Sequence, residues 1–209
     1  MPAVEHHDEF VVDPDEVKVP ESPQHRAAVD LIALAAQRRL GGTARIYRDM
    51  NWYPTDGGNA VAPDALVLPP GALEPDDRSY KQATAGGPDP IAAIEVPSHT
   101  DGYAAFREKL RRYRRLGVVS YVVEVGRDAC TVERWRPDAV APEDWLGRPI
   151  PELGGVVLVA SEAGELAVRL EDGTLARSDV ELLQHAEGER GRAHRRARAR
   201  LRAMGADPA

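Results

Sequence analysis

The chain has 209 residues, of which 43% are apolar and 5% aromatic, and its formal net charge at pH 7 is −7. The apolar fraction is enough for one sizeable core. The negative charge argues against a nucleic-acid coat that works by bulk charge, and the few aromatics argue against a base-stacking platform. The single cysteine, Cys130, excludes an intramolecular disulfide framework and a cysteine-rich zinc site. Because no apolar run reaches roughly 18 residues and the acidic start lacks a signal pattern, we expect a cytoplasmic protein with no membrane partner.

The first expected elements are an acidic segment and a long helix. Residues 1–12 are expected to form a mobile terminus, and the charges that alternate with valine over 16–19 suggest a short edge strand. Ser22 can cap a helix whose first position suits Pro23. Apolar residues then recur at helical spacing until the two glycines at 41–42 end the helix.

Short strands separated by turns are expected next. The segments 45–52 and 61–68 have strand character, and 71–90, with its proline, glycine and aspartate, is typical of a loop. The continuous apolar run over 91–96 is typical of a buried central strand.

The second half should begin with a helix over about 101–116, capped by Thr100 or Asp101 and ended by Gly117. A hairpin, a small meander and an arginine-rich helical tail from about residue 187 should follow. The strands expected in this half are 118–125, 131–135, 156–160, 165–170 and 174–176.

This order of elements predicts a mixed sheet flanked by helices, and therefore an α/β or α+β fold. We expect a mobile acidic N-terminus over 1–12 and one domain over 13–183. A helical or disordered arginine-rich tail is expected over 184–209.

Two carboxylates are placed at the ends of apolar strands. Asp64 follows Pro63 inside the segment AVAPDALVL, and Glu95 lies inside IAAIEVPS. An acid inside a buried strand is costly unless it is paired or binds a metal, so two such acids could form a hard-cation site. The alternative is that both lie at strand edges and face solvent.

Lys109 occupies an unusual position on the second expected helix. On a helical wheel it falls in the apolar arc, whereas the arginines of the helix lie on other faces. Because the helix starts just after Glu95, Lys109 can lean back toward the two acids, where it could fix an attacking water or stabilise charge on a phosphate. The alternative is that its stem packs and its ammonium reaches water. The apolar arc holds Phe106, Leu110, Tyr113 and Leu116.

Together these residues form a pattern that resembles the Uma-type putative restriction endonuclease family of the PD-(D/E)XK nuclease superfamily. The likeness covers about residues 10–135, with a weaker match to about 183. It is carried by Ser22-Pro23, His25, Pro63-Asp64, Glu95-Val96, Ser98, Asp101, Lys109, Tyr113, Gly117-Val118 and Tyr121.

The resemblance implies a restriction-endonuclease-like mixed sheet flanked by helices, here with a small β-meander and a C-terminal helical tail. It implies that Asp64 and Glu95 bind Mg²⁺, with Mn²⁺ as a possible substitute and the Val96 backbone carbonyl as a third ligand. It further implies that Lys109 orients or activates the water that attacks a DNA phosphodiester. A homodimer, with paired sites for the two strands, is implied as well.

The sequence departs from the standard superfamily motif at Pro97, where a lysine is expected two positions after Glu95. The resembling family shows the same absence, with its lysine on the following helix, and that position matches Lys109. Ser120 stands where the family often has glutamate, and Val122 where tryptophan is common.

Several other residues keep two interpretations. Glu16 or Glu21 could supply a further acid or be solvated, and His25 could line the cleft or lie at the surface. The arginine-rich tail could contact DNA phosphates, remain solvated, or pair with the acidic N-terminus of the same or another chain. Trp135 and Trp145, with the strands around them, offer more apolar edge than a small monomer needs, which also suggests a dimer.

The leading interpretation is a Mg²⁺-dependent endonuclease that hydrolyses DNA phosphodiester bonds. One rival is a catalytically silent binding or scaffold protein with the same fold, favoured by the acidic net charge and by the lack of a DNA-reading module. Another is a metal-dependent phosphoesterase that acts on small nucleotides.

Overall fold

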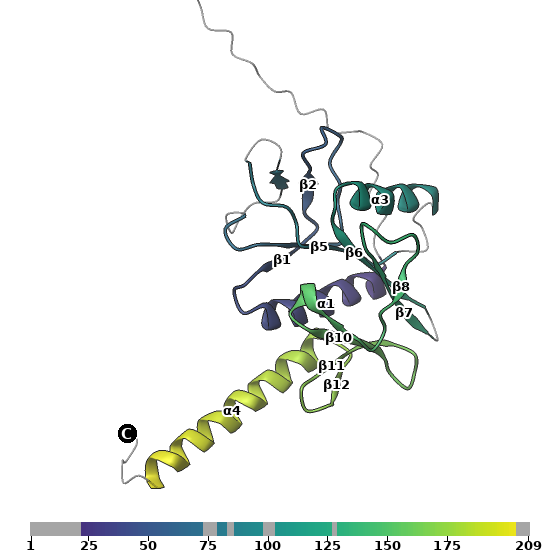
Figure 1. Cartoon of the computed structure of the whole chain (residues 1–209). Coiled ribbons are helices and arrows are strands. Elements are labelled where there is room, and N and C mark those ends of the chain that lie inside the picture. Colours follow the sequence, from purple (N-terminus) through teal and green to yellow (C-terminus); the bar gives the residue numbers. More distant parts are fainter. Residues whose placement is uncertain (1–21, 73–78, 83–85, 98–102, 127–128, 204–209) are drawn as a thin grey trace, which may run out of the picture.

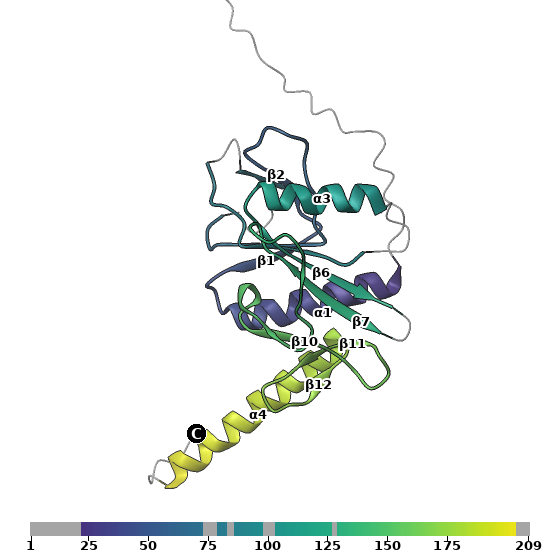
Figure 2. The ribbon, with the colours of Figure 1, turned by 45° about the vertical axis from the view of Figure 1, so that its right-hand side comes forward.

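The computed structural model describes residues 22–72, 79–82, 86–97, 103–126 and 129–203. Helices cover both faces of a six-stranded mixed sheet, with α1 on one side and α3 on the other (Figures 1 and 2). The predicted fold class is therefore confirmed. The acidic segments at 1–12 and 16–19, including Glu16, lie outside the described residues, as does Glu21. Among the helices that are described, none has the length and apolar character needed to cross a membrane.

Helix α1 spans Pro23–Leu40 and has the ends that the sequence predicted. The Ser22 hydroxyl accepts a hydrogen bond from the backbone N–H of His25 at 3.1 Å, which caps the first turn. Gly41 ends the helix with a φ of 55°, a left-handed conformation that glycine adopts without steric cost. The helix packs its apolar side, which includes Leu31 and Ile32, onto the sheet.

The main sheet has the strand order β1-β3-β5-β6-β7-β8. Strands β5 and β6 are parallel and the other pairs are antiparallel. Successive residues alternate between the α1 face and the α3 face, as the period of a strand requires. The strands are β1 (Arg45–Arg48), β3 (Ala65–Leu68), β5 (Ala92–Glu95), β6 (Val119–Val125), β7 (Cys130–Trp135) and β8 (Glu143–Asp144).

The strand predicted over 45–52 is divided in the structure. Asp49 has a φ of 51°, and this left-handed residue separates β1 from β2 (Asn51–Tyr53). Strand β2 pairs in parallel with β4 (Ser79–Lys81) in a separate two-stranded sheet. The strand predicted from 61 begins only at Ala65, because Val61 instead forms an isolated bridge with Trp52.

Helix α3 spans Tyr103–Arg115, and its predicted caps, Thr100 and Asp101, lie outside the described residues. Gly117 follows it with a φ of 74°. The predicted hairpin is present as the antiparallel pair β6 and β7. The predicted meander is also present, as part of a second sheet of order β12-β11-β10-β9. This sheet consists of β9 (Pro149–Ile150), β10 (Val156–Ala160), β11 (Leu166–Arg169) and β12 (Leu175–Ala176), and the 3-10 helix η1 (Pro151–Leu153) follows β9.

The C-terminal helix α4 spans Asp179–Ala203 and begins eight residues before the predicted start at 187. Two hydrogen bonds cap its start. The Ser178 hydroxyl accepts from the Glu181 N–H at 3.2 Å, and the Glu181 carboxylate accepts from the Arg177 N–H at 2.7 Å. Serine followed three residues later by glutamate is the sequence signature of such a cap. The start expected at 187 rests instead on the arginine-rich composition further along the chain.

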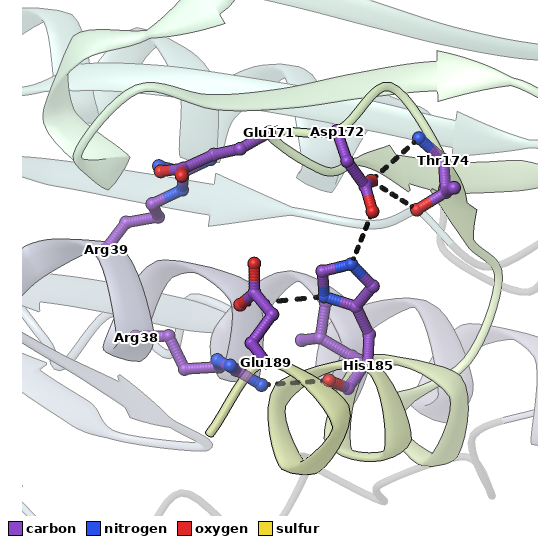
Figure 3. Close-up of polar contacts among 8 residues, drawn as sticks. Arg38, Arg39, Glu171, Asp172, Thr174, His185 and Glu189 are labelled. Atoms are coloured by element: carbon purple, nitrogen blue, oxygen red, sulfur yellow. Dashed lines mark hydrogen bonds and ion pairs between the residues drawn. The ribbon is translucent and has the colours of Figure 1, made fainter. Parts of the chain in front are cut away.

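The first turns of α4 are anchored to the body of the protein (Figure 3). The imidazole of His185 lies 2.8 Å from Asp172 on the turn after β11, and Arg38 of α1 donates to the Leu182 carbonyl at 2.8 Å. Leu182 and Ala186 are buried. Residues 192–200 are exposed, and the helix projects beyond the two sheets (Figures 1 and 2).

Candidate active site

The pairing of β3 with β5 brings the two predicted acids together. These strands are antiparallel, with Ala65 opposite Ile94. The residue before Ala65 is Asp64 and the residue after Ile94 is Glu95, so the two acids stand opposite each other at one end of the sheet. The Val96 N–H donates to Asp64 Oδ2 at 2.6 Å, which fixes Asp64 against the end of β5.

The neighbours of Glu95 on its own strand show why its carboxylate turns toward α3. Ile94 packs in the cluster on the α1 side of the sheet, whereas Ala93 packs in the cluster that includes Leu110 and Tyr113 of α3. Glu95 follows Ile94 and therefore shares the face of Ala93. Its side chain is 4% exposed, so solvent contributes little to stabilising its charge.

Two side chains of α3 contact the Glu95 carboxylate. Lys109 Nζ lies 2.8 Å from Glu95 Oε2, and the Tyr113 hydroxyl donates to Glu95 Oε1 at 2.6 Å. Lys109 and Tyr113 are four residues apart, which places them on the same helix face one turn apart. Lys109 Nζ also donates to the Ala62 carbonyl at 2.6 Å. The ammonium is therefore held between the end of β5 and the segment that leads into β3.

The electrostatic balance at Glu95 is dominated by its burial. The pKa of Glu95 is raised from its ordinary value of 4.5 to about 7, mainly by burial and to a smaller extent by the negative charge of Asp64. The positive charge of Lys109 opposes this rise without cancelling it. Burial and the adjacent Glu95 also raise the pKa of Tyr113 well above its ordinary value, so its hydroxyl stays protonated and donates. Burial therefore leaves the ionised form of Glu95 incompletely stabilised by its protein partners.

His25 reaches the same place from the first turn of α1. Its Nε2 lies 3.4 Å from Asp64 Oδ1, and its side chain is buried. The sequence left open whether His25 lines the cleft or lies at the surface. In the structure it lies in the site, beside Asp64. The cap at Ser22 positions this first turn, which links the helix start directly to the site.

The donor set of the site matches a hard divalent cation. Asp64 and Glu95 provide carboxylate oxygens, and the Asp64 side chain is 19% exposed, which leaves the site accessible from solvent. Within the described ranges, no group of three or more His, Cys, Asp or Glu side chains is arranged to hold a metal. Two carboxylates and a backbone carbonyl would therefore need water to complete the coordination shell, and Mg²⁺ commonly keeps several waters.

The sequence did not assign a separate role to the Tyr113 hydroxyl or to the Ala62 carbonyl. The helical spacing from Lys109 to Tyr113 could have identified the first, because both fall in one arc of α3. The second is a backbone group, and its position depends on how the chain enters β3. Ser120 and Val122, the two departures from the family pattern, are buried in β6.

Comparisons with known proteins identify the family and the fold. The model of the Uma2 family, described as "Putative restriction endonuclease", matches residues 4–172. Among solved structures, the fold is similar to that of a putative nuclease belonging to DUF820 from Anabaena variabilis, with a TM-score of 0.51 and 14% sequence identity. That similarity covers 64% of this chain and 75% of the other, and at this identity it shows the fold alone. Comparison with curated proteins finds no match. Because the family match extends over most of the sequence and includes the site, the chain belongs to the Uma2 family.

Proposed function

We propose that this protein is a Mg²⁺-dependent endonuclease that hydrolyses phosphodiester bonds in DNA, with Mn²⁺ able to replace Mg²⁺. The observation that carries the proposal is the meeting of Asp64, Glu95 and Lys109, which come from the start of β3, the end of β5 and the middle of α3. Membership of a family whose description is "Putative restriction endonuclease" supports the same reaction class.

Each of these residues has a defined part in the proposal. Asp64 and Glu95, with the Val96 carbonyl, would hold the ion, which when bound supplies Lewis-acid activation of the phosphodiester. Lys109 would orient the attacking water or stabilise negative charge that develops on the phosphate. Tyr113 holds one oxygen of Glu95 in place and thereby keeps the other directed toward Lys109.

A catalytically silent scaffold is the second candidate, and one observation favours it. Both carboxylates already have protein partners: Asp64 contacts the Val96 N–H and His25, and Glu95 contacts Lys109 and Tyr113. A satisfied buried network of this kind can serve fold specificity without turnover.

A metal titration combined with a cleavage assay separates the two candidates. We expect millimolar Mg²⁺ to raise the melting temperature by mass action and to support nicking of supercoiled plasmid. Asp64→Asn keeps the shape of the side chain but removes a charge from the metal site, so it should lose both effects while the protein remains folded. Asp138→Asn, at a side chain that is 76% exposed, is the matched control and should retain both.

Three results would redirect the proposal. Nicking by Asp64→Asn at the wild-type rate would refute the assignment of the site. A melting temperature that ignores every divalent ion, with no nicking in Mg²⁺ or Mn²⁺, would favour the scaffold. Hydrolysis of small phosphate esters, without cleavage of plasmid, would instead indicate a phosphoesterase for small nucleotides.

The proposal includes a homodimer that works on DNA in the cytoplasm. The two tryptophans do not provide the expected apolar edge, because Arg107 lies over Trp135 and Arg134 lies 4.6 Å from the centre of the Trp145 ring. Three exposed apolar side chains occur instead at β12 and in the first turns of α4. These are Leu175, Val180 and Leu183, which are 40%, 55% and 48% exposed. The single thiol, at Cys130, is buried and is compatible with a reducing compartment.

A further inference from the structure

Helix α3 carries a row of arginines on the side away from the candidate active site. Arg107, Arg111 and Arg114 follow one another at spacings of four and three residues, which places them on one face of the helix. We call these three residues the arginine ridge. Lys109 and Tyr113, which contact Glu95, lie on a different face of the same helix. The ridge therefore has a fixed position relative to the two candidate metal ligands.

The ridge forms one wall of a pocket of about 260 Å³. Val140 and Pro142, from the loop between β7 and β8, also line the pocket, as does Trp135. Val140 is 93% exposed, so this apolar lip has no cover from the rest of the described chain. No acidic side chain is found among the described residues that line the pocket.

Within the described residues, the charges of Arg111 and Arg114 are only partly balanced. Arg111 lies 3.3 Å from Glu108, but Glu108 is shared with Arg115, which lies 3.0 Å away. The Nε of Arg114 is buried and has no hydrogen-bond partner within the described part of the chain. Like charges one turn apart repel, so a bound anion would relieve the ridge.

The length of the ridge indicates the kind of anion. Seven residues of helix rise by about 10 Å, so the three guanidinium groups extend over a longer distance than a single phosphate needs. Successive phosphates of one DNA strand rise by about 3.4 Å along the duplex axis and also turn around it, so a straight ridge of about 10 Å is long enough for two neighbouring phosphates. Arginine also has the planar fork of donors that matches phosphate oxygens. Arg107 already covers Trp135, at 5.5 Å from the ring centre, which leaves charge rather than base stacking as the basis of recognition.

We propose that the arginine ridge binds the sugar-phosphate backbone of duplex DNA on the side of α3 away from the candidate active site, without reading base sequence. This inference rests on the proposed function, because it takes DNA as the substrate of the candidate active site. Phosphate contacts of this type fix the orientation of a protein on the duplex and carry no sequence information. The apolar lip at Val140 and Pro142 would lie against the deoxyribose next to the bound phosphates.

The test measures binding separately from cleavage. The double variant Arg111→Gln/Arg114→Gln removes two charges, and Arg107 is kept because it covers Trp135. The matched control is Arg45→Gln/Arg177→Gln, which removes the same charge from exposed residues of β1 and of the segment before α4. Like Arg111, Arg177 forms an ion pair with a glutamate nearby in the sequence, in this case Glu181. All proteins carry Asp64→Asn and are kept free of divalent ions, and fluorescence anisotropy with a short duplex follows binding from about 50 to 200 mM salt.

We expect the slope of log affinity against log salt to fall by about 1.8 in the ridge variant, at about 0.9 for each lost phosphate contact. The control should keep the wild-type slope. The charge-conserving Arg111→Lys/Arg114→Lys should restore most of the slope, which a variant that merely disturbs packing would not do. Circular dichroism melts verify that each variant is folded.

Several outcomes would overturn the inference. The first is that the ridge variant has the same slope of log affinity against log salt as the control. The second is that the lysine variant fails to restore this slope. The third is that the wild-type protein binds no duplex at low salt. A site for small anions would be indicated if inorganic phosphate raised the melting temperature, and the ridge variant lost this effect, while no duplex bound. Failure of the nuclease proposal looks different, because the wild-type protein would then bind duplex through the ridge and cut none.

Discussion

Glu95 ends strand β5 in the interior, where its carboxylate contacts Lys109 and Tyr113. Two effects compete at this residue. Burial and the charge of Asp64 disfavour the ionised form, and Lys109 and the Tyr113 hydrogen bond favour it. Because the pKa of Glu95 rises to about 7, the disfavouring effects prevail. A charge that is destabilised in this way is typical of functional sites, where a ligand supplies the missing compensation.

The raised pKa of Glu95 predicts how stability depends on pH. The folded protein binds the Glu95 proton more tightly than the unfolded chain does, so the free energy of unfolding should fall as pH rises from about 4.5 to about 7. At about 1.4 kcal/mol per unit of pKa, this single group accounts for a decrease in the free energy of unfolding on the order of 3 kcal/mol. Glu95→Gln does not titrate and should lack this component. Urea unfolding in EDTA at about pH 5 and about pH 8 measures the difference between the two proteins. If the wild-type protein and Glu95→Gln differed in free energy of unfolding by the same amount at both pH values, the prediction would be contradicted.

Lys109 is the residue whose removal should separate metal binding from turnover. Lys109→Met keeps an aliphatic stem in the apolar arc of α3 but removes the ammonium beside Glu95. We expect the rate of plasmid nicking in saturating Mg²⁺ to fall by about 10²-fold or more, the scale of one lost electrostatic stabiliser. The shift of the melting temperature by Mg²⁺ should remain. Both are measured well above pH 7, because loss of Lys109 raises the pKa of Glu95 further.

Arg115→Gln is the control for this experiment, since Arg115 pairs with Glu108 on an outer face of α3. It should nick plasmid at nearly the wild-type rate. Wild-type turnover by Lys109→Met would exclude the lysine from the mechanism.

Helix α1 shows how a local cap positions a side chain of the site. The Ser22 hydroxyl holds the first turn through the His25 N–H, and His25 lies beside Asp64. The opposite end is closed by Gly41 in a left-handed conformation. Between these ends the helix packs against both sheets, since Ile32 and Ala36 share a core cluster with strands of each. A change at the cap should therefore affect the fold and the site together.

Ser22→Ala should lower the free energy of unfolding by about 1 kcal/mol, the usual cost of losing an N-cap. For a chain of this length that is a fall in melting temperature of about 2–4 °C. Differential scanning calorimetry can measure it. Ser161→Ala is the comparison, because the Ser161 hydroxyl accepts one N–H of an exposed turn rather than starting a helix. A larger loss in Ser161→Ala than in Ser22→Ala would contradict the role given to the cap.

At the scale of the whole molecule, one core joins the two sheets. Residues of α1, of the main sheet and of the second sheet belong to a single buried cluster. A polar network also crosses between the sheets: Tyr121 donates to Glu152 at 2.7 Å, and Arg134 donates to the same carboxylate at 2.8 Å. The meander therefore packs into the same core as the main sheet. The exposed apolar residues near α4, which are Leu175, Val180 and Leu183, remain available for contact with a second copy of the chain.

We expect light scattering at micromolar concentration to give about twice the mass of one chain, because a two-fold dimer is the commonest way to cover a shared apolar surface. Leu183→Glu places a charge on that surface and should shift the protein to monomer. Since Leu183 is 48% exposed, the fold should tolerate the change. Asp138→Asn serves again as a control with unchanged mass. A monomeric wild-type protein would refute the dimer.

The sequence by itself determined the elements whose causes are local. Ser22 and Gly41 mark both ends of α1, the apolar run around Ile94 predicts a buried strand, and the position of Lys109 in the apolar arc predicts a lysine that faces inward. Such patterns depend on residues within one or two turns of each other, or on neighbours along one strand, and can be read without knowledge of distant contacts. The resemblance to the family pointed to Asp64 and Glu95, the same two acids that the strand pattern had indicated.

The tertiary structure alone decided which strands pair and in what register. That register sets Asp64 opposite Glu95, places the Val96 N–H on Asp64, and leads Lys109 to the Ala62 carbonyl. It also divided the strand predicted over 45–52, where Asp49 turns the chain so that β2 can pair with β4. These choices depend on contacts between residues far apart in the chain, where a shift of one position would exchange the two faces of a strand. No local pattern fixes such contacts, because their energy is gained only when the whole core is assembled.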